Sequence, residues 1–155
     1  MYNTMRKKTL SFFLSLSIGA SAFAQTTEPL WMRGGSISPD GKQIAFSYMG
    51  NLYTVPVQGG DAKQLTTNES YEGHPMWSPD GTELAFCSNR EGSMDVFIMS
   101  ADGGNAKRLT KNSVTELPSA FTPDGKHVVF SASIQDPAES VLFPTSALSE
   151  LYQVP

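Results

Sequence analysis

The chain has 155 residues, of which 39% are apolar and 17% are charged, and its formal net charge is −4. This is the length of one ordinary domain. The acidic charge argues against a nucleic-acid partner, which would need a basic patch, and the 10 prolines and 13 glycines argue against a helical bundle.

The segment 1–24 is predicted to be a secretory signal peptide. Basic residues at 6–8 precede an apolar run over 10–20, and Ala22-Phe23-Ala24 supplies a small-x-small cleavage site. The apolar run is too short to cross a bilayer as a helix. We therefore expect cleavage after Ala24 and a periplasmic or secreted product that comprises residues 25–155. Gln25 stands where a lipoprotein would need cysteine, so no membrane anchor is expected after cleavage.

The exported part is built from a repeat. A tetrapeptide that ends in Pro-Asp-Gly occurs three times, at steps of 40 and then 44 residues. Proline presets φ at about −65°, aspartate can bond its own backbone, and glycine accepts the left-handed conformation that ends the turn. Each copy therefore predicts a tight turn between two strands. The copies are Ser38-Pro39-Asp40-Gly41, Ser78-Pro79-Asp80-Gly81 and Thr122-Pro123-Asp124-Gly125.

Two short apolar segments follow each turn, and a double glycine follows the second segment in the first two repeats. The apolar segments predict strands, and the glycines at 59–60 and 103–104 predict a second hairpin. Each repeat thus predicts four short antiparallel strands in about 40–44 residues, which is the size of a β-propeller blade. The apolar segments are 44–46 and 52–55, 84–86 and 96–99, and 128–130 and 151–154.

The predicted fold is all-β: a partial β-propeller of four-stranded antiparallel blades over residues 25–155. The repeats cover about 30–70, 71–113 and 114–155, so two full blades and most of a third form an incomplete ring. The strand at 96–99 is apolar on both of its faces, which indicates that blades cover it from both sides. A two-layer sandwich, the alternative, would alternate more cleanly between apolar and polar residues.

Two places depart from the repeat. The connection between the second and third strands lengthens along the chain, and its longest copy, about Ser133 to Ser149, is either a solvated loop or a rim loop that contacts a partner. Gly34 and Gly35 stand in the first strand of the first repeat, where glycine weakens a strand. That strand is expected to be irregular or to pair with a segment outside the chain.

The repeats resemble the Pro-Asp-Gly propeller repeats of exported bacterial proteins, and the run from Leu30 to Pro155 resembles the N-terminal propeller of tricorn-like serine proteases. The resemblance rests on the segments 37–41, 44–47, 52–56 and 95–104. It implies one or two propellers that filter peptides ahead of a PDZ module and a serine protease core. Such a core lies outside this chain, whose expected partners are therefore further blades, the core, and peptides or proteins.

No catalytic, cofactor-binding or metal-binding residue is predicted in the chain, and no cofactor is expected. Cys87, the only cysteine, lies in an apolar run and is expected to be a buried thiol. His74 and His127, the only histidines, are expected at the ends of hairpins without a catalytic duty. The chain has no Gly-x-Ser-x-Gly elbow, His-Glu-x-x-His or Cys-x-x-Cys motif. It is therefore interpreted as a noncatalytic part of an enzyme.

The aspartates and aromatic residues of the repeats have structural interpretations. Asp40, Asp80 and Asp124 occur once per repeat, too far apart for a calcium-binding loop, and are expected to form turns. Trp77 and Phe121 occupy the same repeat position, which favours a packing role over a carbohydrate or peptide platform. Other aromatic residues that such a platform could use are Trp31, which precedes the repeats, and Tyr53, Phe97 and Tyr152.

Three functions remain open at this point. The first is a noncatalytic propeller segment of an exported tricorn-like serine protease, which serves as a scaffold and in peptide access. The second is a protein-binding propeller that resembles TolB, although TolB-like proteins place an α/β domain before the propeller. The third is the propeller of a dipeptidyl-peptidase-like enzyme. The sequence downstream of Pro155 distinguishes them.

Overall fold

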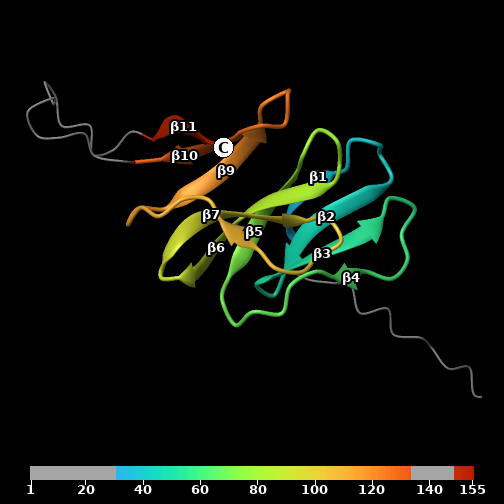
Figure 1. Ribbon diagram of the computed structural model, residues 1–155. Helices are drawn as coiled ribbons and strands as arrows, with labels where there is room; N and C mark the ends of the chain where they lie inside the picture. Colours follow the sequence, from blue (N-terminus) through green and yellow to red (C-terminus); the bar gives the residue numbers. More distant parts are fainter. Residues whose placement is uncertain (1–30, 134–148) are drawn as a thin grey trace, which may run out of the picture.

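A computed structural model describes residues 31–133 and 149–155 (Figure 1). These residues form strands and turns that are grouped in three antiparallel sheets. The predicted signal peptide and nearly all of the long connection at 133–149 lie outside the described residues. Among the described residues, no helix is long and apolar enough to cross a membrane.

Each sheet is formed by one repeat and is named here as a blade. Blade 1 has the strand order β1-β2-β3-β4, blade 2 has the order β5-β6-β7-β8, and blade 3 has the order β11-β10-β9. The strands are β1 (Arg33–Ile37), β2 (Gln43–Tyr48), β3 (Asn51–Pro56), β4 (Lys63–Gln64), β5 (Glu72–Trp77), β6 (Glu83–Glu91), β7 (Ser93–Ser100), β8 (Lys107–Arg108), β9 (Glu116–Phe121), β10 (Val128–Ala132) and β11 (Glu150–Val154). The all-β prediction and the four-stranded blade are confirmed, with no closed ring in the part of the chain that is described.

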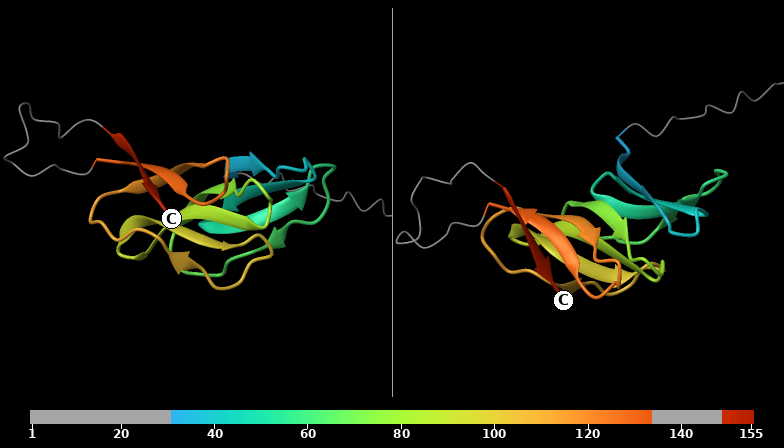
Figure 2. Two further views of the ribbon diagram at one scale, coloured as in Figure 1. Left: turned by 45° about the horizontal axis from the view of Figure 1, so that its top comes forward. Right: turned by 90° about the horizontal axis from the view of Figure 1, so that it is seen from above.

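The three blades are stacked, with blade 2 between the other two (Figures 1 and 2). The side chains of Leu84 and Phe86 in β6 pack with those of blade 1, whereas Ala85 between them packs with blade 3. Successive residues of a strand point to opposite faces, so both faces of β6 are covered by apolar neighbours. This explains why the central stretches of the middle strands, such as 84–86 and 96–99, are apolar on both faces.

Two apolar clusters hold the blades together. The first seam, between blades 1 and 2, contains Ala45, Leu52, Leu65, Leu84, Phe86, Phe97 and Met99. The second seam, between blades 2 and 3, contains Ala85, Val96, Val128, Phe130 and Ala132. Trp77 packs on the first cluster and Phe121 on the second, so the predicted packing role of this repeat position is confirmed.

The inner strands of blades 1 and 2 carry the same bulge. Gly34 and Gly35 interrupt the pairing of β1 with β2, and His74 and Pro75 interrupt the pairing of β5 with β6. Gly34 has φ of 60° and His74 has φ of 52°, so in these two blades the position has left-handed backbone, which glycine adopts at no steric cost. The expected irregularity of the first strand is confirmed. β1 is the edge strand of blade 1 and pairs with β2 on one side. Pairing of its other edge with a segment outside the chain stays a prediction.

Candidate functional site

The antiparallel order gives each blade two ends with different chemistry. One end, called the turn end, carries the Pro-Asp-Gly turns and the double-glycine loops. The other end, called the hairpin end, carries the β2–β3 and β6–β7 hairpins and the segments that enter β5 and β9. The inner strands β1, β5 and β9 are neighbours, so residues at their starts gather at the hairpin end.

The aspartates of the three Pro-Asp-Gly turns, called the turn aspartates, act within their own turns. In the first turn, the Ser38 hydroxyl donates to Oδ1 of Asp40 at 2.6 Å and the Lys42 N–H donates to the same oxygen at 3.1 Å. These bonds favour the ionised carboxylate and lower the pKa of Asp40. The same pattern lowers the pKa of Asp80 and Asp124, with Ser78 and Thr122 as the hydroxyl donors. The turn-forming role that the sequence predicted is therefore confirmed.

A polar hollow of about 680 Å³ lies at the turn end between blades 1 and 2. Its walls carry Asp40 and Asp80 from the turns, and Asp61 and Asp102 from the double-glycine loops. Lys63 of β4 spans the hollow and lies 3.8 Å from the Asp102 carboxylate, with both side chains largely exposed. An exposed pair of this kind contributes little to stability, and two of the four acids are already engaged in turns.

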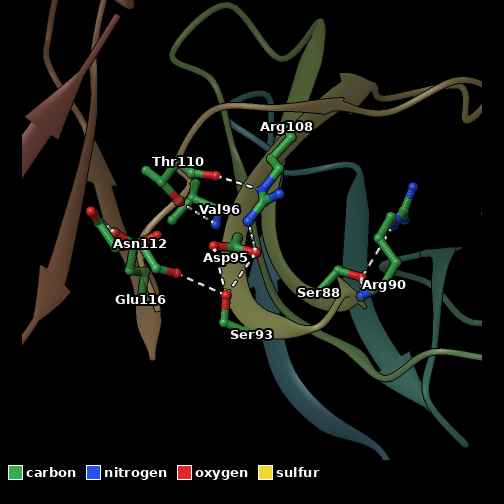
Figure 3. Close-up of polar contacts among 9 residues, drawn as sticks. All are labelled: Ser88, Arg90, Ser93, Asp95, Val96, Arg108, Thr110, Asn112 and Glu116. Atoms are coloured by element: carbon green, nitrogen blue, oxygen red, sulfur yellow. Dashed lines mark hydrogen bonds and ion pairs between the residues drawn. The ribbon is translucent and has the colours of Figure 1, made fainter. Parts of the chain in front are cut away.

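Blade 2 contains a buried ion pair that the sequence analysis did not anticipate (Figure 3). Asp95, at the start of the apolar stretch of β7, is fully buried, and its Oδ2 lies 2.7 Å from Nη2 of Arg108 in β8. The Nε of Arg108 also donates to the Thr110 carbonyl at 2.7 Å. The Ser93 hydroxyl lies 3.3 Å from each carboxylate oxygen of Asp95 and 2.8 Å from the Asn112 carbonyl. This network ties β7 to the segment that leads into blade 3.

Blade 1 carries neutral amide side chains at the two positions of this pair, and Oδ1 of Asn51 is buried without a hydrogen-bond partner. Asn51 and Gln64 occupy the repeat positions of Asp95 and Arg108, and Gln64 donates to the Thr66 carbonyl at 2.8 Å, as Arg108 does to that of Thr110. Both members of the pair therefore change together between the repeats. The joint change fits the physics, because a buried carboxylate without its cation would be strongly destabilising.

Two further buried carboxylates start the inner strands of blades 2 and 3. Glu72 and Glu116 are fully buried, and each accepts a hydrogen bond at Oε1 from the asparagine four residues earlier. Glu72 also forms an ion pair with Arg90, whose guanidinium lies 4.7 Å from the centre of the Phe97 ring. A repeated Thr-x-Asn-x-x-x-Glu pattern, at 66–72 and 110–116, was the sequence signal for these residues.

The cysteine and the two histidines occupy structural positions in the blades. Cys87 is fully buried and donates to the Gly73 carbonyl at 3.3 Å, and burial raises the pKa of its thiol to about 11. Ser47, at the same position of blade 1, donates to the corresponding carbonyl of Arg33. His74 sits in the bulge of β5 and His127 beside the third turn. Among residues 31–133 and 149–155, no three His, Cys, Asp or Glu side chains form a group that could hold a metal.

Comparison with known proteins decides the family. The model of the tricorn protease N-terminal beta propeller domain matches residues 26–147. The chain belongs to this family. Among curated relatives, dipeptidyl-peptidase 5 of Porphyromonas gingivalis is 31% identical in an alignment of 116 residues that covers 59% of this chain and 17% of the relative. Tricorn protease homolog 1 of Streptomyces coelicolor is 34% identical over 60 residues, which is 39% of this chain and 6% of the relative.

Solved structures show the same fold. A putative TolB from Agrobacterium tumefaciens has a TM-score of 0.63 at 24% identity, and the match covers 82% of this chain and 51% of the TolB chain. The tricorn protease has a TM-score of 0.60 at 15% identity, over 80% of this chain and 13% of that one. The chain thus spans less than a fifth of the length of the two curated relatives.

Proposed function

We propose that this chain is a noncatalytic N-terminal propeller segment of an exported tricorn-like serine protease, where it acts as a scaffold and admits peptide substrates. The observation that carries the proposal is the match of residues 26–147 to the model of the tricorn protease N-terminal beta propeller domain, which supports such a role. The homologues include two peptidases that are much longer than the matched region, so the chain is expected to work together with a protease core.

The chemistry of the described residues favours a noncatalytic, scaffolding role. Their cysteine is a buried thiol with a raised pKa, which makes it a poor nucleophile. The turn aspartates are bound into their own turns, and the buried Asp95 carboxylate holds β7 to β8 through Arg108. A rigid stack with exposed loops at both ends is a suitable frame for positioning substrate next to another domain.

The reading frame beyond Pro155 and the activity of the full-length gene product test this proposal. We expect a PDZ module and a serine protease core downstream. We also expect the full-length product to hydrolyse peptides and lose that activity with a serine-directed inhibitor. A full-length product with no hydrolase core would contradict the proposal. For the export step, N-terminal sequencing of the periplasmic or secreted product should begin at Gln25, whereas an uncleaved Met1 would contradict export by signal cleavage.

A second candidate is the propeller of a dipeptidyl-peptidase-like enzyme. It is favoured by the match to dipeptidyl-peptidase 5, which extends over 116 residues, compared with 60 for the tricorn homologue. An α/β-hydrolase domain directly after the propeller, with no PDZ module, would select this candidate. A TolB-like protein-binding propeller is supported by the likeness in fold, and a downstream region without any hydrolase would select it.

A further inference from the structure

The hairpin end of the first seam contains a pocket of about 550 Å³. Arg33 of β1 and Ser47 of β2 form one wall, the Met49-Gly50 turn forms a second, and Tyr71, just before β5, forms a third. Trp31 lies at its rim. Every wall comes from blades 1 and 2, so the pocket is complete within the described part of the chain.

The residues of this pocket are not those that the repeat requires. Arg33 pairs with Ser47 in blade 1, and the positions that correspond in blade 2 are Gly73 and Cys87. Blade 2 therefore forms the same bulged pair of strands without an arginine. Since the turn aspartates and seam residues do recur, a side chain that departs from the repeat and stays exposed has a role other than stacking the blades.

Two exposed apolar side chains stand here on unfavourable backbone. Met49 has φ of 49° and its side chain is 76% exposed, and Trp31 has φ of 84° and is 72% exposed. The two-residue turn between Tyr48 and Asn51 favours asparagine or aspartate before glycine, so methionine there costs about 1 kcal/mol. Neither side chain gains burial in return. Strain combined with exposure is typical of a surface that meets a ligand.

The pocket combines this apolar surface with a positive charge. The guanidinium of Arg33 lies 5.7 Å from the centre of the Trp31 ring, and none of the ion pairs among the described residues uses it. The opposite wall is held in place, because the Tyr71 N–H donates to Oδ1 of Asn89 at 2.8 Å. An available guanidinium beside aromatic and thioether groups matches a carboxylate next to an apolar side chain.

We propose that this pocket, formed by Trp31, Arg33, Met49 and Tyr71, binds an extended peptide segment that carries an aspartate or glutamate next to an aromatic or large aliphatic residue. Arg33 takes the carboxylate and the apolar walls take the neighbouring side chain. The exposure of Trp31 and Met49 leaves the pocket open on two sides, so the bound chain continues past it and the carboxylate is that of a side chain. This extends the proposed role in peptide access, on which it rests, by assigning a site and a ligand class.

Equilibrium binding of labelled peptides to the purified chain tests the assignment. The probe is a fluorescein-labelled hexapeptide, Gly-Gly-Phe-Glu-Gly-Gly with an amidated end, followed by fluorescence anisotropy at low ionic strength. We expect it to bind about fivefold to tenfold more tightly than the peptides with Phe-Gln or Ala-Glu at the centre. Arg33→Gln and Trp31→Ala should each weaken binding by a similar factor. Lys126→Gln removes the same charge from an exposed site at the turn end and should leave binding unchanged.

Three results would overturn the assignment: no binding, equal binding of the Phe-Glu and Phe-Gln peptides, or unchanged affinity after Arg33→Gln. Tighter binding of a peptide that ends in a free Phe carboxylate would also overturn it, because that result assigns a terminal carboxylate as the ligand. The thermal unfolding of each variant should match that of the unsubstituted chain, which separates loss of the pocket from loss of the fold. Because binding is measured without hydrolysis, its outcome is independent of whether a protease core follows the propeller.

Discussion

The buried pair of Asp95 and Arg108 offers the sharpest prediction about stability. Arg108→Gln leaves the fully buried Asp95 carboxylate without its cation. Loss of one partner of a buried pair costs about 3–5 kcal/mol, and the Arg108 side chain is 24% exposed, so access of water reduces the expected cost to about 2–3 kcal/mol. For a chain of this length that corresponds to a fall in Tm of about 6–12 °C.

The double variant Asp95→Asn with Arg108→Gln places in blade 2 the two amide side chains that occupy the same repeat positions in blade 1. Because no charge is then buried, we expect it to lose less than about 1 kcal/mol. The coupling energy from urea denaturation of the two single variants and the double variant should therefore be about 2 kcal/mol or more. Matched changes at Asn51 and Gln64 to alanine provide the control for a neutral pair. Additive effects of Asp95→Asn and Arg108→Gln would refute the inference that the two repeat positions change together for electrostatic reasons.

Three further predictions concern the repeat itself. The turn aspartates have pKa values in the folded state that are lower than in the unfolded chain. Their contribution to stability is therefore present above about pH 4 and is lost as the pH falls through the lowered values. A Tm that stays constant as the pH falls from about 5 to 2 would contradict this prediction. Cys87 should resist maleimide labelling at pH 8 in the folded chain and react in urea, and Cys87→Ser should fold because Ser47 fills that place in blade 1. His74→Gly should change the free energy of unfolding by less than about 1 kcal/mol, whereas His74→Val should lower it by more, because φ is positive at His74 as it is at Gly34. Equal urea midpoints for the two variants would refute the inference that position 74 favours a residue that tolerates left-handed backbone.

The blades could be predicted from the sequence because their turns are local. Pro39-Asp40-Gly41 and its two copies determine where the chain reverses, and the apolar segments between turns can only be strands. Coverage of β6 on both faces could also be predicted, since Leu84, Ala85 and Phe86 are all apolar. These features depend on neighbours within a few residues along the chain.

The candidate sites could be predicted only in part, because they depend on contacts between repeats. The bulge was visible as Gly34-Gly35 opposite His74-Pro75, but it was interpreted as a weakness until φ showed its purpose. The exchange of Asn51 and Gln64 for Asp95 and Arg108 becomes visible only when the repeats are superposed. Tyr71 lies 38 residues from Arg33 in the sequence, and only the stacking of blades 1 and 2 brings both to one pocket.

The most direct test of the central claim, a noncatalytic propeller segment of a serine protease, is to label the full-length gene product with a fluorophosphonate probe and to map the modified serine by mass spectrometry. The account predicts one modified serine, located outside residues 25–155, and loss of peptide hydrolysis in proportion to labelling. A modified serine within residues 25–155, or peptide hydrolysis that persists at full labelling, would contradict it.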